Sequence, residues 1–377
     1  MTSPGASLSI GIPFLDLVAP HRSLEDELVA AFRRALQSAS FVGGSEVTAF
    51  EQEFATFVTA THAVAVNSGT DALRFAYMAL GIRAGDEVLT VPNTFIATTE
   101  ALTQAGATIR FVDVTPGTLT MDPNAAAAAI GPRTVGIVPV HLYGQPADMD
   151  PLLALARQRG LWIVEDAAQA HGAAYRGKPS GTLGSLSAFS FYPGKNLGAC
   201  GEGGAVVGSD AGHLETVRRL REHGQSRKYY HESEGYNGRL DAIQAAFLRV
   251  KLRHLADWNA ARQRVAVWYR EALGDVSEVR LPVQAPYAAH VWHLFVIEAE
   301  RRDALQAHLT AHRIGTGLHY PLPLHLQAAY RHLGLGRGAF PVTERAADRI
   351  LSLPMFPELT QDQVGRVADA IRAFYRG

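Results

Sequence analysis

Short apolar segments alternate with amphipathic segments through the first half of the chain. The apolar segments predict strands at residues 62–67, 87–92, 108–114, 134–141, 161–166, 186–192 and 203–209. Between them, the helical spacing of apolar positions predicts helices at 71–80, 95–106 and 151–160. The strands are rich in Val and Ile and show little polar alternation, as expected for a sheet buried on both faces. The pattern therefore predicts an α/β fold with a mostly parallel sheet.

After about residue 240 the pattern changes to long helices. Residues 239–273 predict two of them, and the remaining chain predicts a lone strand at 291–299 and helices at 301–313, 342–350 and 360–375. This succession is typical of a smaller α+β domain. We therefore expect a large α/β domain over residues 1–250, which includes a helix around Leu24 to Leu36, and a small C-terminal domain over residues 251–377.

Composition and charge narrow the class of protein. The 377 residues are 47% hydrophobic and 19% charged, as in a globular protein. The formal net charge is -1, so no global field attracts the chain to nucleic acid or to an acidic membrane, and neither is expected as a partner. Cys200 is the only cysteine, which excludes an internal disulfide and a cysteine-based zinc site; no metal is expected.

Residues 1–17 lack a basic segment followed by a long apolar one, so they do not resemble a signal peptide. No apolar run approaches the length that spans a bilayer. The single cysteine is also compatible with a reducing compartment. Together these features lead us to expect a cytoplasmic protein.

The first candidate functional segment is VNSGTDAL at residues 66–73, where a predicted strand meets a predicted helix. Ser68, Gly69 and Thr70 are small and leave backbone N–H groups free at the helix N-terminus. Such a terminus binds phosphate through those donors and the helix dipole. The alternative is an ordinary helix cap, because Ser, Thr and Asp are favoured there in any helix.

The second segment is IVEDAAQAHGA at residues 163–173. Asp166 ends a predicted buried strand, and ligands of open α/β sheets bind at those ends. A buried carboxylate needs a cation or hydrogen bonds, and a protonated pyridine nitrogen is such a cation. The alternative is that Asp166 caps the next helix.

The third segment is AFSFYPGKNLGACGEGGAVV at residues 188–207. Lys195 follows an apolar strand inside a Pro/Gly turn, where loss of hydration favours its neutral, nucleophilic amine. Ser190 and Tyr192 share one face of the strand by alternation. The glycines at 198–204 fit no nucleotide-binding motif, so we expect a turn whose backbone passes close to a cofactor.

A helix N-terminus for a phosphate, an Asp for a pyridine nitrogen and a Lys for an aldehyde are the parts of a pyridoxal 5'-phosphate (PLP) site. Their order along the chain is more specific than any one of them. Lys195 and Asp166 are therefore the predicted catalytic residues, and PLP is the predicted cofactor.

These motifs resemble those of the DegT-type sugar aminotransferases of fold type I, and the resemblance runs from IPFLDL at 12–17 to LSLPMFPELT at 351–360. It implies that Lys195 forms the Schiff base with PLP and that Asp166 pairs with the pyridinium. It further implies roles for Gly69, Thr70 and Ser190 at the phosphate, Gln169 near the ring oxygen and Phe95 stacked on the ring. The family is dimeric, and Asn237 of the partner subunit is expected to reach the phosphate.

Two segments, 221–241 and 317–327, resemble the branch that aminates C-3 of a keto sugar on a nucleotide. The implied reaction moves an amino group from L-glutamate to a dTDP-linked 3-keto-6-deoxyhexose. The resemblance places Tyr192, Lys228, His319 and Tyr320 near the sugar or its diphosphate. His319 and His325 are otherwise ordinary loop residues, and no carboxylate cluster supports a metal pair.

Several alternatives stay open at this point. Amination at C-4 is the nearest, and a PLP sugar dehydratase or a non-catalytic regulator are the others on the same fold. The presence of Lys195 and Asp166 argues against the last two, since dehydratase relatives carry His in place of the lysine. No dinucleotide fingerprint supports a Rossmann dehydrogenase. Cys200 stands where a bulky aromatic is common, and we expect it to reshape the pocket slightly without a catalytic role.

Overall fold

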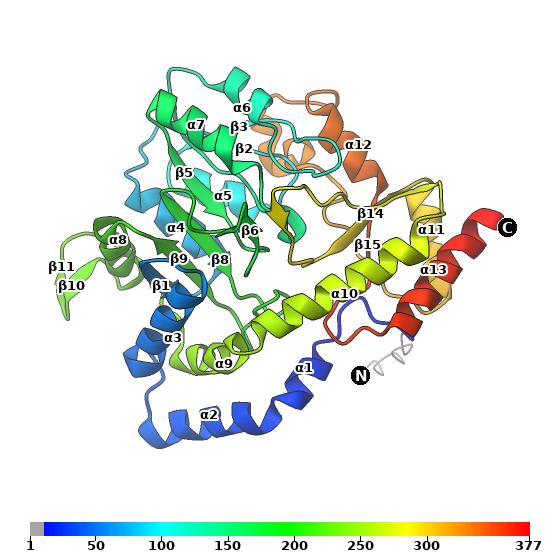
Figure 1. Cartoon of the computed structure of the whole chain (residues 1–377). Coiled ribbons are helices and arrows are strands. Elements are labelled where there is room, and N and C mark those ends of the chain that lie inside the picture. The colour runs from blue at the N-terminus through cyan, green and yellow to red at the C-terminus, as the bar shows by residue number, and fades with distance from the viewer. Residues whose placement is uncertain (1–10) are drawn as a thin grey trace, which may run out of the picture.

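The computed structural model describes residues 11–377, so part of the expectation about a signal sequence, which concerns residues 1–10, lies outside the described residues. A seven-stranded sheet forms its centre, in the order β1-β9-β8-β5-β4-β2-β3 (Figure 1). Its strands are β1 His62–Val66, β2 Glu87–Thr90, β3 Thr108–Phe111, β4 Thr134–Ile137, β5 Trp162–Asp166, β8 Leu186–Ser190 and β9 Gly204–Gly208.

The sheet is parallel except at β9, which runs antiparallel to both of its neighbours, β1 and β8. The other pairs, β2–β3, β2–β4, β4–β5 and β5–β8, are parallel. The prediction of a mostly parallel sheet is confirmed. Because parallel strands end at one edge, Asp166 at the end of β5 and Ser190 at the end of β8 lie on the same side.

Helices cover both faces of this sheet, and the strand alternation assigns each residue to a face. In β9, Ala205 and Val207 pack with α3 (Gly44–Phe57) and α9 (Ala242–Leu252). Val206, between them, packs on the other face with α4 (Gly69–Ala79) and α8 (Ala211–Arg221). The remaining helices of this half are α5 Ala97–Gln104, α6 Pro123–Ala129 and α7 Met149–Arg159.

The C-terminal part carries its own three-stranded antiparallel sheet, β12-β14-β15. Its strands are Val279–Arg280, Phe295–Ala299 and Ile350–Leu353, and its helices are α10 Leu255–Leu273, α11 Arg302–Ala311, α12 Pro341–Arg349 and α13 Gln361–Arg376. The prediction of a lone strand is therefore wrong. The partner strand β15 is only four residues long, three of them apolar, and directly follows a helix, so such a run shows no strand period.

Ile12 joins the core of this C-terminal sheet and forms an isolated bridge to Ile314. The described part of the chain thus starts beside its own C-terminal part before it enters the large sheet. A domain boundary at residue 250 stays a prediction.

The periphery holds shorter elements. Two helices, α1 Val18–Ser23 and α2 Glu25–Ser38, lie outside the large sheet, and a hairpin of β10 (Gln225–Arg227) and β11 (Tyr230–His231) projects at the left edge of Figure 1. Small strands β6 Ala174–Tyr175, β7 Lys178–Pro179 and β13 Ala288–Ala289 pair together, and 3-10 turns occur at η1 Leu142–Gly144, η2 Leu324–Leu326 and η3 Ala328–Leu333.

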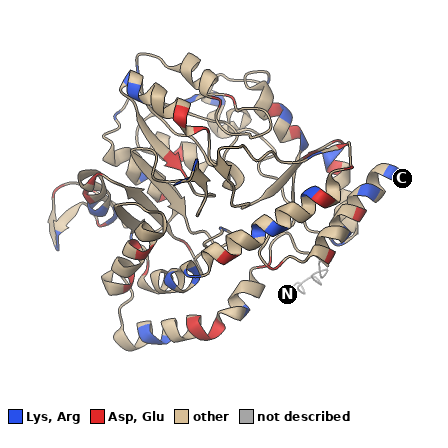
Figure 2. Cartoon of the chain, viewed as in Figure 1, with Lys and Arg blue, Asp and Glu red and all other residues tan. Residues whose placement is uncertain are grey.

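Charged residues of both signs lie along the outer helices α2, α10 and α13 in the view of Figure 2. Of the helices in residues 11–377, none combines the length and the apolar character that crossing a membrane requires.

Candidate active site

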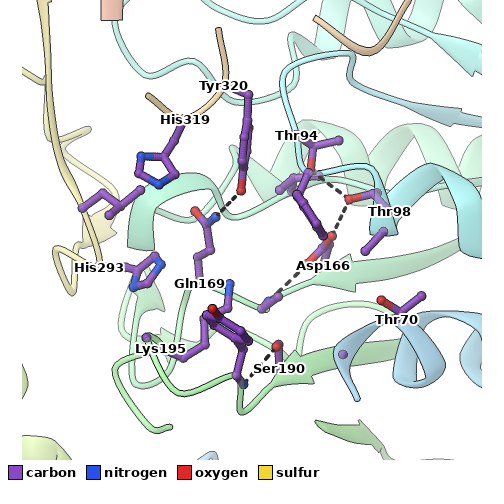
Figure 3. Close-up of a pocket in the computed structure, with 18 of the residues that line it drawn as sticks. Thr70, Thr94, Thr98, Asp166, Gln169, Ser190, Lys195, His293, His319 and Tyr320 are labelled. Atoms are coloured by element: carbon purple, nitrogen blue, oxygen red, sulfur yellow. Dashed lines mark hydrogen bonds between the residues drawn. The ribbon is translucent and has the colours of Figure 1, made fainter. Parts of the chain in front are cut away.

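A cavity of about 690 Å³ opens at the carboxyl edge of the large sheet. It brings together most of the predicted site residues, from elements far apart in the sequence (Figure 3): Ser68, Gly69, Thr70, Phe95, Asp166, Gln169, Ser190, Tyr192, Lys195, His319 and Tyr320. The N-terminal segment adds Phe14 and Leu15 to the wall. The cavity therefore depends on both halves of the chain.

The start of α4 forms one corner of this cavity. Ser68 is the helix cap, and its hydroxyl accepts a hydrogen bond from the Asp71 backbone N–H at 3.1 Å, as the alternative interpretation expected. A Cβ on Gly69 would lie 2.5 Å from the Cβ of Ser190, so only glycine lets the helix start approach the end of β8 this closely. The corner combines a helix N-terminus with the Ser190 hydroxyl, and this combination fits a phosphate group.

Asp166 is buried in the cavity wall. Its carboxylate accepts hydrogen bonds from the Thr98 hydroxyl at 2.7 Å and from the Ala168 backbone N–H at 3.2 Å. Both donors are neutral, and burial raises the pKa of Asp166 above its ordinary value. A cation at this carboxylate would offset the cost of burial, and the protonated nitrogen of a pyridine ring fits that requirement.

Lys195 lies in the turn after β8, where its backbone N–H donates to Tyr192 O at 2.8 Å. Burial lowers the pKa of its amine to about 8, although the charge of Asp166 works against that shift. The next residue, Asn196, anchors the turn by donating to Asn259 Oδ1 at 2.9 Å and to Val291 O at 3.0 Å. The lowered pKa gives this lysine a far larger neutral fraction near neutral pH than an ordinary lysine has, which suits it as a nucleophile for an aldehyde and as a base for proton transfer.

Gln169 links two walls of the cavity. Its Oε1 accepts from the Tyr143 backbone N–H at 2.6 Å, and its Nε2 donates to the Tyr320 hydroxyl at 3.3 Å. The Phe95 ring is 55% exposed and lies 5.9 Å from the Tyr320 ring. An aromatic ring exposed inside a cavity is available to stack on a flat ligand. The predicted contacts of Phe95 and Gln169 with a cofactor ring stay predictions.

His319 and Tyr320 enter the cavity from the C-terminal part. Burial lowers the pKa of His319 to about 4, and the nearby charge of Lys195 adds to that shift. Its ring stacks on Phe14 at 5.6 Å, and its Nδ1 lies 2.8 Å from the Ser352 hydroxyl. At neutral pH this part of the wall therefore offers uncharged hydrogen-bonding groups rather than cations.

Two predicted residues, Lys228 and Asn237, do not line the cavity of their own chain within residues 11–377. Lys228 is exposed in the turn of the β10–β11 hairpin. Asn237 is also exposed, and its side-chain oxygen accepts from Arg239 at 2.6 Å.

The glycine-rich stretch after Lys195 packs closely against other parts of the chain. A Cβ on Gly198 would lie 2.3 Å from Pro193 O, and one on Gly204 would lie 2.3 Å from Ser68 O. These glycines therefore allow the chain to pass close to itself, and the expected passage of this backbone close to a cofactor stays a prediction. Cys200 likewise does not line the cavity, because its sulfur lies 3.4 Å from Lys251 Nζ and 3.5 Å from His21 Nε2.

Sequence reasoning missed several lining residues, among them Thr94, Thr98, Glu202 and His293. Thr94 and Thr98 are four residues apart where the chain enters α5, and their hydroxyl oxygens lie 2.8 Å apart. His293 interrupts an otherwise apolar run, and its Nδ1 lies 3.1 Å from Asn196 Oδ1. Both features were visible in the sequence, but neither points to a partner without the fold.

The residues present fit three parts of PLP. The start of α4 suits its phosphate, Asp166 its ring nitrogen and Lys195 its aldehyde. When bound, PLP supplies an electron sink for the carbon that gains or loses the amino group. Lys195 would hold the cofactor covalently and, once an incoming amine has freed its Nζ, would move a proton there, while Asp166 would keep the ring nitrogen protonated.

Fold and site together define a PLP-dependent enzyme of fold type I. Residues 22–372 match the DegT/DnrJ/EryC1/StrS aminotransferase family, and the chain belongs to that family. The protein is a PLP-dependent sugar aminotransferase, as the resemblance of its motifs predicted.

Individual relatives are similar over nearly their whole length. The dTDP-3-amino-3,4,6-trideoxy-alpha-D-glucose transaminase of Streptomyces venezuelae is 49% identical, over 96% of this chain and 95% of its own. The UDP-N-acetyl-3-dehydro-alpha-D-glucosamine 3-aminotransferase of Acidithiobacillus ferrooxidans is 44% identical, over 97% of this chain and 98% of its own. The crystal structure of DesV from S. venezuelae with a ketimine intermediate matches with a TM-score of 0.95 and 48% identity, over 97% and 99% of the two chains.

Proposed function

We propose that this aminotransferase moves the amino group of L-glutamate to C-3 of a nucleotide-linked keto sugar, a 3-keto-6-deoxyhexose on dTDP. The observation that carries this proposal is the pairing, in one cavity, of Lys195 with the uncharged His319 and Tyr320 across from it (Figure 3). Hydroxyl and keto groups of a sugar are neutral, so neutral donors and acceptors suit them. The S. venezuelae relative, named for a 3-amino sugar on dTDP, supports the position and the nucleotide.

The two relatives differ in the nucleotide, because the A. ferrooxidans relative is named for a UDP sugar. Both names place the amino group at C-3. We therefore propose C-3 amination first, dTDP as the carrier and UDP as the second candidate.

Anion recognition requires groups from outside this cavity. L-glutamate carries two carboxylates and a sugar nucleotide carries a diphosphate, whereas Lys195 is the one lysine or arginine lining the cavity in residues 11–377. Basic side chains gather instead near the exposed β10–β11 hairpin, at Arg227, Lys228 and Arg239. We propose a homodimer with shared sites, in which Lys228 of the partner subunit meets the diphosphate and Asn237 of the partner subunit meets the cofactor phosphate. The proposed location is the cytoplasm.

The substrate proposal is tested by incubating the enzyme with L-glutamate and a panel of dTDP- and UDP-linked 3-keto and 4-keto sugars. We expect the dTDP-linked 3-keto-6-deoxyhexose to react fastest and NMR of the product to show nitrogen on C-3. Nitrogen on C-4 would overturn the position and leave the aminotransferase class standing. His319→Ala should slow the sugar half-reaction more than the glutamate half-reaction, because only the former uses this wall.

The shared site is tested by mixed dimers. Asn237→Ala and Lys195→Ala are each expected to be poorly active alone, and their mixture should regain activity because one of two sites then holds both intact residues. Proven mixed dimers without activity would contradict a shared site. If the site is shared, Lys228→Ala should raise KM for the nucleotide sugar and leave the rate of the glutamate half-reaction unchanged, as expected for a point charge that meets the diphosphate.

A further inference from the structure

Thr98 lies directly behind the Asp166 carboxylate, in the first turn of α5. Its hydroxyl donates to Asp166 Oδ2 at 2.7 Å, and its oxygen lies 2.8 Å from the hydroxyl of Thr94. Thr94 is 3% exposed and Thr98 is 1% exposed. Figure 3 shows the two contacts as one continuous chain from Thr94 through Thr98 to Asp166.

The donor and acceptor of each of these two hydrogen bonds follow from the chemistry of Asp166. An ionised carboxylate only accepts hydrogen bonds, so the Thr98 proton is directed at Asp166. The Thr98 oxygen can then accept the proton of Thr94. Hydrogen bonds in such a series polarise one another, and a hydrogen bond to the charged form of an acid favours that form.

The backbone around Thr98 is fixed from two sides. Its carbonyl oxygen accepts from the Tyr77 hydroxyl of α4 at 3.3 Å, and its N–H donates to Phe95 O at 3.2 Å. The same short turn therefore presents Phe95 to the cavity and places the Thr98 hydroxyl behind the carboxylate. A displacement of Phe95 would therefore also move the Thr98 hydroxyl, and the reverse holds too.

We propose that Thr98 is a positioning residue for the cofactor, whose hydroxyl, backed by Thr94, holds the Asp166 carboxylate ionised and oriented toward the ring nitrogen. The other hydrogen bond to Asp166, from the Ala168 backbone N–H, is longer, at 3.2 Å. Burial raises the pKa of Asp166, and the Thr98 hydrogen bond is the largest effect that opposes it. The inference rests on PLP dependence alone, not on the identity of the sugar.

The test compares two buried threonines on one helix. Thr98→Val replaces the hydroxyl by a methyl group, and Thr98→Ser restores a hydroxyl. Thr99→Val is the matched control, because Thr99 is equally buried and its hydroxyl bonds Tyr330 at 2.6 Å and Ile96 O at 2.9 Å, away from Asp166. Each cofactor-free protein is titrated with PLP and with its 1-deaza analogue, in which a C–H group replaces the ring nitrogen.

Thr98→Val should weaken PLP binding about tenfold, the usual size of a lost hydrogen bond to a charged group. Thr98→Ser should stay within about twofold of the parent, and Thr99→Val should bind PLP as the parent does. With the deaza analogue, the parent and Thr98→Val should bind equally, because Asp166 then has no ring nitrogen to meet. A purely structural role for Thr98 would weaken both ligands alike.

Unchanged PLP affinity in folded Thr98→Val, or an equal loss with the analogue, would overturn the proposal. If Thr98→Val does not fold, Thr94→Val decides instead: removing the outer hydroxyl should weaken PLP about threefold and leave the analogue unaffected. None of these titrations contains a sugar nucleotide, so failure of the substrate proposal leaves their outcome intact.

Discussion

Glu165 and Asp166 are consecutive at the end of β5, and both are buried, yet their surroundings differ. Glu165 accepts four hydrogen bonds of 2.7 to 2.8 Å, from His141 Nε2 and from the backbone N–H groups of Gly181, Leu183 and Gly184. Asp166 accepts two, from neutral donors. Alternation along the strand sends the two side chains to opposite sides of the sheet.

The electrostatic consequence is opposite for the two acids. Burial by itself raises the pKa of Glu165, but the His141 and backbone donors outweigh it and hold that pKa below its ordinary value. For Asp166 burial prevails, and the pKa lies above its ordinary value. A fully satisfied carboxylate serves the fold, whereas an incompletely satisfied one retains the capacity to bind a cation. Glu165 is therefore the acid that stabilises the fold, and Asp166 beside it is the acid suited to bind a cation.

The largest effect is expected from Asp166→Asn, which should lower turnover about a thousandfold. An amide cannot hold the ring nitrogen protonated, and removing one partner of a buried charge pair costs about 3–5 kcal/mol. The measurement is single-turnover kinetics of the glutamate half-reaction. The cofactor-free variant should unfold at a higher temperature than the parent, because a costly buried charge is gone. A lower unfolding temperature would show that Asp166 is structural after all.

Glu165→Gln should have the reverse profile, with a loss of about 3 kcal/mol in the free energy of unfolding of the cofactor-free protein. The amide nitrogen of Gln would face N–H donors where a carboxylate oxygen now accepts them. Thermal or denaturant unfolding, measured beside Asp166→Asn, is the check. If both variants moved the unfolding temperature in the same direction, the distinction between the two acids would fail.

The sequence predicted Asp166 but not the role of Glu165, for a physical reason. Asp166 is marked by local signals, an apolar strand that ends in an acid and a compatible Lys195 later in the chain. The donors of Glu165 come from residues 181–184 and from His141, so they depend on long-range pairing. Thr98 is a similar case, because its contact with Asp166 requires helix α5 to pack at the end of a strand that follows it by many residues.

The large sheet was also predictable from local pattern, since each of its strands is a separate apolar run. The C-terminal sheet was not, because β15 is four residues long and adjoins α12 without a break. Lys228 and Asn237 mark a different limit. Their predicted roles involve a second copy of the chain, and no pattern within one chain fixes how two copies meet.

Lys195 provides a way to measure the field of Asp166. Covalent capture of PLP by the cofactor-free protein requires the neutral Lys195 amine. The capture rate should therefore rise with pH, and the midpoint of this rise should lie at about pH 8. The negative charge of Asp166 raises the pKa of Lys195, so Asp166→Asn should shift the midpoint to lower pH, whereas Glu165→Gln should leave it in place. Visible absorbance after rapid mixing gives the rate. A parent midpoint near 10.5, the ordinary lysine value, would contradict the effect of burial.

The smallest expected effect is in the pH dependence of the stability of the cofactor-free proteins. Glu165 and Asp166 should affect this stability in different pH ranges. A depressed pKa means that Glu165 stabilises the fold fully above the unfolded value of about 4.3 and loses this contribution only as pH falls through its lower folded value. The stability gap between the parent and Glu165→Gln should therefore be flat from about pH 5 to 7.

For Asp166 the sign is reversed. A raised folded pKa means that the protonated acid is favoured in the fold, so the parent loses stability as pH rises from the unfolded value of about 3.9 through the folded value. The gap between the parent and Asp166→Asn should open across that window, at no more than about 1.4 kcal/mol per pH unit. Saturating PLP should close it, because the cofactor supplies the missing cation. A stability gap that changes neither with pH nor with PLP would mean that other groups in the protein already compensate the buried charge of Asp166.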